Sequence, residues 1–233
     1  MPSDIKLRAE VQRYDPSSDA APRYETYEVA GKDNWRVLDV IRSIYENQCG
    51  DLAYQFACRA GRCGTCGVKV NGVPVLACQE RCKPRMRIEP LTPFPVLRDL
   101  VVDRSEVEAR YEKHGLAPKR KTPYAGGPES IAPQLAEELC RMDSCLACMV
   151  CVSGCPAVAE RAFDGPAFML KLRHMAKHPA DTANRLKQAI EGGMLECFGC
   201  DLCTQLCPAD LSPAQAIREF RRDLVFGGGR GHD

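Results

Sequence analysis

The chain has 233 residues, with 32 Lys and Arg against 31 Asp and Glu, so its formal net charge is +1 at pH 7. A near-neutral chain lacks the basic excess that binds nucleic acid, and we expect no nucleic-acid partner. Its length suffices for two small domains, and its hydrophobic share of 45% is ordinary for a globular protein. The one unusual count is cysteine, with 15 in the chain.

The start of the chain does not combine a basic segment with an apolar run, so we expect no signal peptide. No run of about 20 apolar residues occurs either, which predicts no membrane span. In such a chain, closely spaced cysteines bind metal more often than they form disulfides. We therefore expect a cytoplasmic protein that reaches the cytoplasmic face of a membrane only through partner subunits.

The first part of the chain predicts strands around one helix. Apolar and polar residues alternate over residues 5–11 and again over 27–29, as in half-buried strands. Over residues 37–45 the apolar residues recur at helical spacing. The pair Asn71-Gly72 between two apolar runs is typical of a two-residue β-hairpin turn.

Composition then divides the chain into four parts. Residues 1–111 predict an α+β domain, and residues 112–132, rich in Pro, Gly and basic residues, predict a linker. Residues 133–226 show helical periodicity up to a last helix opened by Pro213. The glycine-rich residues 227–233 predict a disordered tail.

The first cysteine group has the spacing C-x4-C-x2-C, with a further cysteine beyond the hairpin: Cys58, Cys63, Cys66 and Cys78. This is the plant-type spacing for a [2Fe–2S] cluster. Glycines between these cysteines let backbone N–H groups turn toward the sulphurs. A zinc site is the alternative, but zinc sites use paired C-x2-C units, and the four-residue gap favours the cluster.

Two further groups are complete C-x2-C-x2-C-x3-C-P runs, the bacterial ferredoxin pattern. The first run has Cys145, Cys148, Cys151 and Cys155, and the second has Cys197, Cys200, Cys203 and Cys207. In two-cluster ferredoxins the fourth cysteine of each run binds the other cluster. One [4Fe–4S] cluster is therefore predicted on Cys145, Cys148, Cys151 and Cys207, and a third cluster on Cys155, Cys197, Cys200 and Cys203.

Cys49, Cys82 and Cys140 remain outside these groups, and we interpret them as small buried hydrophobic residues. The chain has no dinucleotide fingerprint, no phosphate-binding loop and no nucleophile–base pair. Iron–sulphur clusters carry one electron at a time, so two-electron chemistry requires another cofactor, typically a flavin on a partner chain. The sequence therefore predicts an electron-transfer subunit with no catalytic residue of its own.

The ordered set of motifs resembles the iron–sulphur subunit of the succinate dehydrogenase/fumarate reductase family over nearly the whole chain. The motifs that carry the resemblance, besides the cysteine groups, are Arg13-Tyr14-Asp15-Pro16, Leu76-Ala77-Cys78, the segment from Pro95 to Asp103, Asp164-Gly165-Pro166-Ala167 and Arg185-Leu186. The resemblance implies an α+β fold: an N-terminal β-grasp [2Fe–2S] ferredoxin domain, then an all-α ferredoxin-like domain with two cubane-type clusters.

The resemblance also implies the partners. A flavoprotein subunit would hold FAD and interconvert succinate and fumarate, and a membrane-anchor subunit would lie at the other end of the electron path. Electrons would run from FAD through the [2Fe–2S] cluster and the middle [4Fe–4S] cluster to the third cluster and an acceptor, and in fumarate reduction the direction would reverse.

Two positions depart from the pattern of many family members. Cys200 stands where a non-cysteine residue leaves a [3Fe–4S] third cluster, which implies a second [4Fe–4S] cluster of lower potential. The alternative is a three-iron cluster with Cys200 nearby but unbound. Residues 156–160 lack the tryptophan, and Phe198 replaces the histidine, of quinone-reactive members. The chain thus looks closer to a subgroup that pairs with a cysteine-rich, heterodisulfide-reductase-like subunit, whose acceptor is a thiol/disulfide couple or a quinone reached indirectly.

Three rival functions remain. The same clusters could serve a related flavoprotein that acts on another acid or a CoA ester, since nothing in this chain identifies the substrate. A free multi-cluster electron carrier is the second rival, although a small acidic protein would be expected for that role. The third is a structural zinc protein.

Overall fold

The computed structural model describes residues 3–127 and 129–227. By their internal contacts these residues form two compact units. The first holds the residues up to Arg104 together with Leu146–Gly154, and the second holds Ser105–Cys145 with the residues from Cys155 onward.

The first unit is built on a five-stranded mixed sheet in the order β2-β1-β5-β3-β4. Its strands are β1 (Asp4–Arg13), β2 (Arg23–Lys32), β3 (Gly67–Val70), β4 (Val73–Leu76) and β5 (Arg85–Glu89). Strands β1 and β5 run parallel, whereas the β1–β2, β3–β5 and β3–β4 pairs are antiparallel. The alternation predicted for residues 5–11 is present, since Leu7, Ala9 and Val11 are fully buried.

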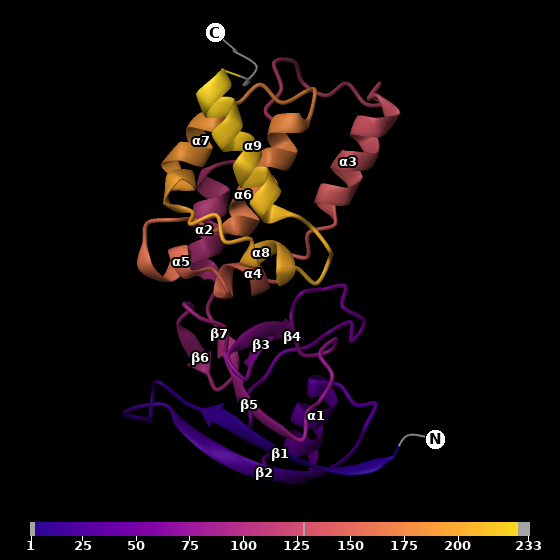
Figure 1. Ribbon diagram of the computed structural model, residues 1–233, viewed down its shortest axis with the longest axis vertical. Helices are drawn as coiled ribbons and strands as arrows, with labels where there is room; N and C mark the ends of the chain where they lie inside the picture. The colour runs from indigo at the N-terminus through magenta and orange to yellow at the C-terminus, as the bar shows by residue number, and fades with distance from the viewer. Residues whose placement is uncertain (1–2, 128, 228–233) are drawn as a thin grey trace. The chain divides into compact units, whose positions relative to one another are not determined.

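Helix α1 (Val37–Asn47) supplies the other half of this core. Its buried face holds Val37, Val40, Ile41 and Ile44, which confirms the helical spacing predicted from the sequence. Figure 1 shows α1 crossing the sheet formed by β1 and β2. A mixed sheet grasping one helix confirms the predicted β-grasp domain.

The predicted hairpin lies between β3 and β4. Asn71 and Gly72 have φ values of 52° and 82°, so both central residues of the turn are left-handed, as a type I′ turn requires. The Asn71 side chain also accepts a hydrogen bond from the Arg87 amide at 2.8 Å. The first unit is completed by the short strands β6 (Val96–Arg98) and β7 (Val101–Val102) and by the one-turn helix α4 (Val150–Ser153).

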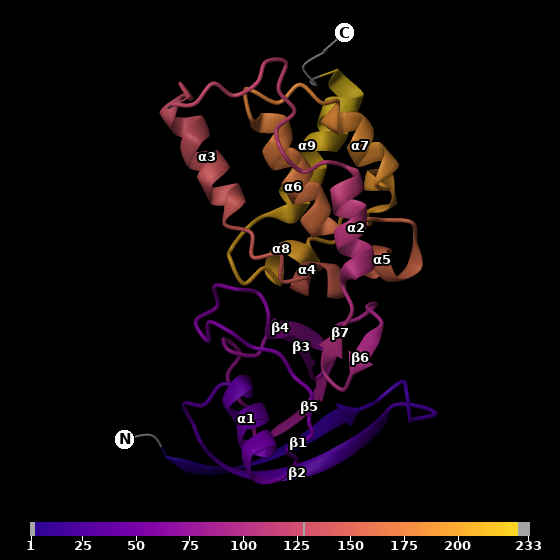
Figure 2. The same cartoon turned by 180° about the vertical axis from the view of Figure 1, so that it is seen from behind.

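The second unit is helical, as predicted, and α6 and α9 pack together at its centre (Figure 1). Its helices are α2 (Ser105–Lys113), α3 (Pro133–Asp143), α5 (Pro156–Glu160), α6 (Pro166–Lys177), α7 (Arg185–Glu191), the 3-10 helix η1 (Met194–Glu196), α8 (Leu202–Gln205) and α9 (Pro213–Phe226). The core residues Phe168, Leu172, Met194 and Phe220 are at most 1% exposed. Helix α3 stands at the edge of this unit in both views (Figures 1 and 2).

A buried ion pair between Arg185 and Asp181 holds the first residues of the predicted linker in place. Arg185 binds Asp181 through two nitrogens, each at 2.8 Å, and both side chains are 2% exposed. The same guanidinium donates to the carbonyl oxygens of Gly115 at 3.0 Å and Ala117 at 2.7 Å. The first residues of the predicted linker are therefore held against α7.

The division by contacts differs from the predicted domain boundaries in two places. Helix α2, which starts within the predicted first domain, belongs to the second unit, and Leu146–Gly154 belongs to the first. Apart from Gly227, the predicted disordered tail lies outside the described residues. None of the helices that the structure describes is long and apolar enough to cross a membrane.

A buried arginine joins segments of the first unit that are distant in sequence. Arg13, which is 4% exposed, donates from Nε to Asp99 at 3.0 Å. Asp99, which is 2% exposed, also accepts the backbone N–H of Tyr14 at 3.0 Å and of Ala53 at 2.9 Å. The end of β1 is thus joined to two loops far away in the sequence.

We expect Arg13→Met to lower the free energy of unfolding by about 3–5 kcal/mol, because the buried Asp99 carboxylate loses its cation at 3.0 Å and keeps only the half-exposed Arg98 at 4.0 Å. Arg23→Met is the matched control, since Arg23 also binds Glu25 but half of its side chain is exposed. Urea unfolding followed by circular dichroism measures both variants. Equal midpoints for the two variants would contradict this role of Arg13.

Candidate metal centres

The first cysteine group lies in the loop between α1 and β3 and just after β4. Cys58 is exposed and Cys63 half-buried, whereas Cys66 and Cys78 are buried. Cys66 interacts electrostatically with both Cys63 and Cys78, and Cys63 with Cys58. The structure therefore brings together the four residues predicted for the [2Fe–2S] cluster.

Backbone N–H groups already point at the outermost sulphur. Cys58 Sγ accepts the amides of Ala60 at 3.4 Å and Arg62 at 3.2 Å. On the opposite side, Gln79 Nε2 donates to Cys78 Sγ at 3.7 Å. N–H donors of this kind stabilise the negative charge that cluster sulphurs carry.

The glycines of this loop are required by close contacts as well as by conformation. Gly64 has φ +71°, and a Cβ there would lie 2.6 Å from the carbonyl oxygen of Leu146 and 2.9 Å from Cys148 Cβ. At Gly61, with φ +66°, a Cβ would overlap the Gln79 side chain at 2.8 Å. Only glycine fits these positions without displacing a neighbour.

The surroundings of Cys63 and Cys66 shift the pKa values of these two thiols in opposite directions. Hydrogen bonds, first of all from the Thr65 hydroxyl, lower the pKa of Cys63 to about 6. Burial raises the pKa of Cys66 to about 12. Cluster binding must therefore displace a more firmly held proton from Cys66 than from Cys63.

The two ferredoxin runs fold alike. In each, the residues before and after the second cysteine are left-handed: Ala147 and Met149 have φ 49° and 63°, and Gly199 and Asp201 have φ 73° and 60°. In each, a one-turn helix, α4 or α8, then carries the third cysteine. Alternating handedness turns successive N–H groups to one side, which makes a concave site for an anion.

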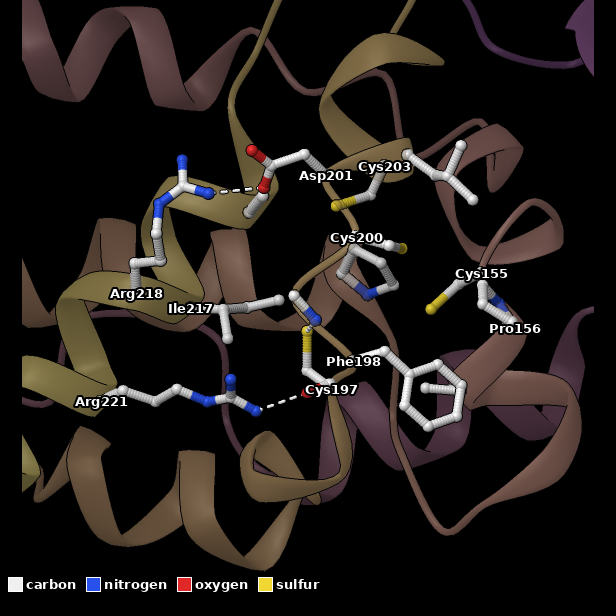
Figure 3. A pocket seen from close by; sticks show the side chains of 15 residues that line it. Cys155, Pro156, Cys197, Phe198, Cys200, Asp201, Cys203, Ile217, Arg218 and Arg221 are labelled. Atoms are coloured by element: carbon white, nitrogen blue, oxygen red, sulfur yellow. Dashed lines mark hydrogen bonds and ion pairs between the residues drawn. The ribbon is translucent and has the colours of Figure 1, made fainter.

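One pocket of the second unit is lined by all four cysteines predicted for the third cluster (Figure 3). Cys155 precedes α5, Cys197 and Cys200 follow η1, and Cys203 lies in α8. Cys203 is buried, Cys155 and Cys197 are half-buried, and Cys200 is exposed. This arrangement joins the last cysteine of one run to the first three of the other.

Burial dominates the ionisation of two of these thiols, Cys203 and Cys155. It raises the pKa of Cys203 to about 12, with the neighbouring Cys155, Cys197 and Cys200 adding to the shift. Burial also raises the pKa of Cys155. Thiolates crowded in this way need a positively charged centre among them, which an iron–sulphur core supplies.

Helix α9 lines the same pocket with two arginines (Figure 3). Arg218 forms an ion pair with Asp201. Arg221 Nη2 donates to the carbonyl oxygen of Cys197 at 2.6 Å, and its Nε is buried without a hydrogen-bond partner. A half-buried cation with a spare, buried donor beside four thiols fits an anionic cluster.

The remaining predicted set draws on both units. Cys148 and Cys151 are buried in the first unit. In the second unit Cys145 and Cys207 pack against one small core of Leu170, Leu211 and Ala216. Contacts within the first unit fix Cys148 and Cys151, and contacts within the second fix Cys145 and Cys207. The ligand set Cys145, Cys148, Cys151 and Cys207 therefore stays a prediction.

Within residues 3–127 and 129–227, no three His, Cys, Asp or Glu side chains converge closely enough to hold a single metal ion. A cluster distributes its ligands over several irons, so its sulphurs stand farther apart than those around one ion. Around the third set the chain also leaves space, because a Cβ added at Gly199 would meet nothing within 4 Å. The four thiols of the third set and the open space beside Gly199 both fit an iron–sulphur cluster.

The interpretation of the remaining cysteines as buried was wrong. Cys140 is exposed on α3, and Cys49 and Cys82 are half-buried. Cys49 accepts a hydrogen bond from Arg13 and donates to Asp51 at 3.0 Å, so it belongs to a polar network. For Cys49 the apolar expectation failed because two charged residues contact the thiol, Arg13 from the end of β1 and Asp51 from its own loop.

Sequence reasoning also missed Arg218 and Arg221. Their only local signal is helical spacing, which places Arg221 one turn after the buried Ile217. That spacing shows that Arg221 flanks the buried face of α9 but not that α9 packs beside Cys197. The contact depends on tertiary structure.

Comparison with known proteins agrees with the division of the cysteines. Residues 8–109 match a family described as a 2Fe-2S iron-sulfur cluster binding domain, and residues 141–211 match a 4Fe-4S dicluster domain. The fumarate reductase iron-sulfur subunit of Mycobacterium tuberculosis is 32% identical over 93% of this chain and 92% of that protein. This chain belongs to the iron–sulphur subunits of the fumarate reductase/succinate dehydrogenase family.

Two other similarities bear on this subunit. One subunit of the fumarate reductase (CoM/CoB) of Methanothermobacter marburgensis is 35% identical over 92% of this chain, which spans 44% of that relative's length. A chain of the Mycobacterium smegmatis Sdh1 complex superposes with a TM-score of 0.86 at 26% identity, covering 96% of this chain and 97% of that one. As an iron–sulphur subunit of this family the chain serves electron transfer, with [2Fe–2S] and [4Fe–4S] clusters as its cofactors.

We expect Gly64→Ala to remove most of the [2Fe–2S] cluster from this iron–sulphur subunit, because the added methyl group would overlap the Leu146 carbonyl oxygen. Gly72→Ala is the matched control: its φ is +82°, but a Cβ there meets nothing within 4 Å. Both variants carry the strain of a left-handed residue, about 1–2 kcal/mol. Visible absorbance and EPR intensity per chain compare them, and equal cluster contents would refute the steric explanation.

Proposed function

We propose that this subunit passes single electrons between the FAD of a partner flavoprotein, which interconverts succinate and fumarate, and a quinone- or thiol-linked acceptor subunit. The observation that carries the proposal is the convergence of Cys155, Cys197, Cys200 and Cys203 on one pocket, in a chain of this family. Iron–sulphur clusters supply one-electron redox chemistry, and the flavin supplies the two-electron step.

We assign three ligand sets to the clusters. Cys58, Cys63, Cys66 and Cys78 would hold the [2Fe–2S] cluster, Cys145, Cys148, Cys151 and Cys207 a [4Fe–4S] cluster, and Cys155, Cys197, Cys200 and Cys203 a second [4Fe–4S] cluster. The mutual placement of the first and third sets supports their assignment. The assignment of the middle set rests on the rule that the fourth cysteine of each run binds the other cluster. The pocket that Cys155 shares with Cys197, Cys200 and Cys203 supports the same rule for the third set.

The chain's own residues would control each site by donors and by burial. The amides of Ala60 and Arg62 hold the exposed Cys58, and the buried Cys66 and Cys203 keep water from the inner side of their sites. Exposed thiols at Cys58 and Cys200 give each of these sites an edge at the surface of its unit. Electrons can enter and leave through such edges, because tunnelling requires close approach of a partner's cofactor.

The acceptor would be reached through a cysteine-rich, heterodisulfide-reductase-like subunit. Phe198, Pro156 and Ala157 line the pocket of the third set, and none of these side chains can donate a hydrogen bond to a quinone oxygen. The donor side chains of the pocket, Arg218 and Arg221, already bind Asp201 and the Cys197 carbonyl. The similarity to a relative named fumarate reductase (CoM/CoB) points the same way, since that name pairs fumarate with a thiol couple. A membrane-anchor subunit is the alternative partner, and association with a membrane would come through either one.

A related flavoprotein that acts on another acid or on a CoA ester remains the second candidate for the substrate. The test is to purify the native assembly without oxygen, add succinate, and follow cluster reduction by low-temperature EPR. Growth of the [2Fe–2S] signal supports the succinate/fumarate assignment. Reduction by dithionite, with no effect of either succinate or fumarate on the redox state, would overturn it while leaving the electron-transfer role intact. A chain that purifies alone and active as a diffusing carrier would contradict the partner flavoprotein.

We expect Cys200→Ala to convert the third cluster to a three-iron form, because only three thiolates would remain around its pocket. Iron per chain should fall by about one atom, and the air-oxidised protein should gain a [3Fe–4S] EPR signal. Cys140→Ala is the control, because Cys140 is equally exposed but lies on α3, away from this pocket. An unchanged iron count and spectrum in Cys200→Ala would show that Cys200 is not a ligand.

A further inference from the structure

Arg221 on α9 holds the segment that presents the first cysteine of the third set. Its Nη2 donates to the carbonyl oxygens of Met194 at 3.1 Å, Leu195 at 3.3 Å and Cys197 at 2.6 Å. These carbonyls belong to η1 and to the residue that follows it. Figure 3 shows the guanidinium reaching from α9 to the backbone of Cys197. One side chain therefore fixes the approach of Cys197 to the pocket.

The charge of Arg221 is not neutralised by a carboxylate. Among the described residues no ion pair involves Arg221, whereas its neighbour in the pocket, Arg218, is paired with Asp201. Arg221 is also less exposed than Arg218, and its Nε is buried without a hydrogen-bond partner. Within the pocket it is thus the cation least screened by water or by a counter-charge.

A cation in this position favours the reduced form of whatever cluster the pocket holds. Reduction adds one negative charge, and a half-buried positive charge nearby stabilises that charge more strongly than a fully solvated one would. Cys200 acts in the opposite sense, because as a fourth ligand it would give a four-iron cluster, which we expect at a lower potential than the three-iron type. The two residues therefore shift the reduction potential in opposite directions.

We propose that Arg221 is a positioning residue that raises the reduction potential of the third cluster and offsets part of the fall caused by Cys200. The inference rests on the proposed binding of a [4Fe–4S] cluster by Cys155, Cys197, Cys200 and Cys203. It adds to that assignment a residue from α9, outside both cysteine runs.

The test is a redox titration of the anaerobically purified complex, followed by EPR of each cluster. In Arg221→Gln we expect the ratio of reduced to oxidised third cluster at a fixed potential to fall about tenfold, which corresponds to about 59 mV for one electron. Arg222→Gln is the matched control, because Arg222 is the next residue on the same helix and is exposed. Arg221→Lys keeps the charge but replaces the planar guanidinium, whose Nη2 donates to three carbonyls, with a single ammonium group.

The readouts separate a tuning role from a merely structural one. Iron and sulphide per chain report loading, and the midpoint of the loaded clusters reports tuning. A fully loaded Arg221→Gln with the wild-type midpoint, or an equal shift in Arg222→Gln, overturns the inference. If Arg221→Gln loads no third cluster, Arg221→Lys decides: a near wild-type midpoint supports the role of the charge, and a tenfold fall refutes it. A wild-type protein without a four-iron third cluster would instead overturn the proposed ligand set.

Discussion

The structure depends on one constraint, which is that four sulphurs from separate segments must converge around each cluster. The third set illustrates the demand, because Cys155 must meet a group more than 40 residues further along the chain, beginning at Cys197. Helices α6 and α7 lie between these two segments in sequence and bring the chain back. Their core, with Phe168 and Leu172 fully buried, therefore serves the geometry of the site as well as stability. Because the sulphurs repel one another as thiolates, this convergence is stable only when an iron–sulphur core compensates their charge.

The local backbone conformation of each ferredoxin run also helps to form the cluster sites. Both ferredoxin runs place left-handed residues on either side of their second cysteine, although only Gly199 among these four residues is a glycine. Ala147 and Met149 adopt the same conformation without the freedom of glycine, at a cost of about 1–2 kcal/mol each. Non-glycine strain of this kind persists where the surrounding structure enforces it. Its recurrence at equivalent positions of both runs indicates that the inward-facing amides are needed for binding and are not accidents of packing.

Features encoded over a few residues could be predicted from the sequence, and features created by distant contacts could not. The hairpin at Asn71-Gly72, the face of α1 and the cysteine sets each depend on spacing within one short segment. The network of Arg13 joins residues up to 86 positions apart, and no local pattern marks Cys49 as one of its members. The grouping of α2 also depends on distant contacts, since this helix begins within the predicted first domain but is grouped by its contacts with the second unit.

Arginine recurs at the points where distant segments are joined, and its chemistry explains why. Arg13 and Arg185 each contact three or more groups on separate stretches of chain, using donors fixed in one plane. Arg221 joins α9 to the carbonyls of one distant segment, residues 194–197. Lysine could supply the charge but not the geometry. These contacts do not involve iron, so they can form before any cluster is inserted, whereas thiolate ligation contributes only afterwards. Arginine contacts can thus hold the loops near their final positions in the empty chain, which reduces the conformational entropy that cluster binding must overcome.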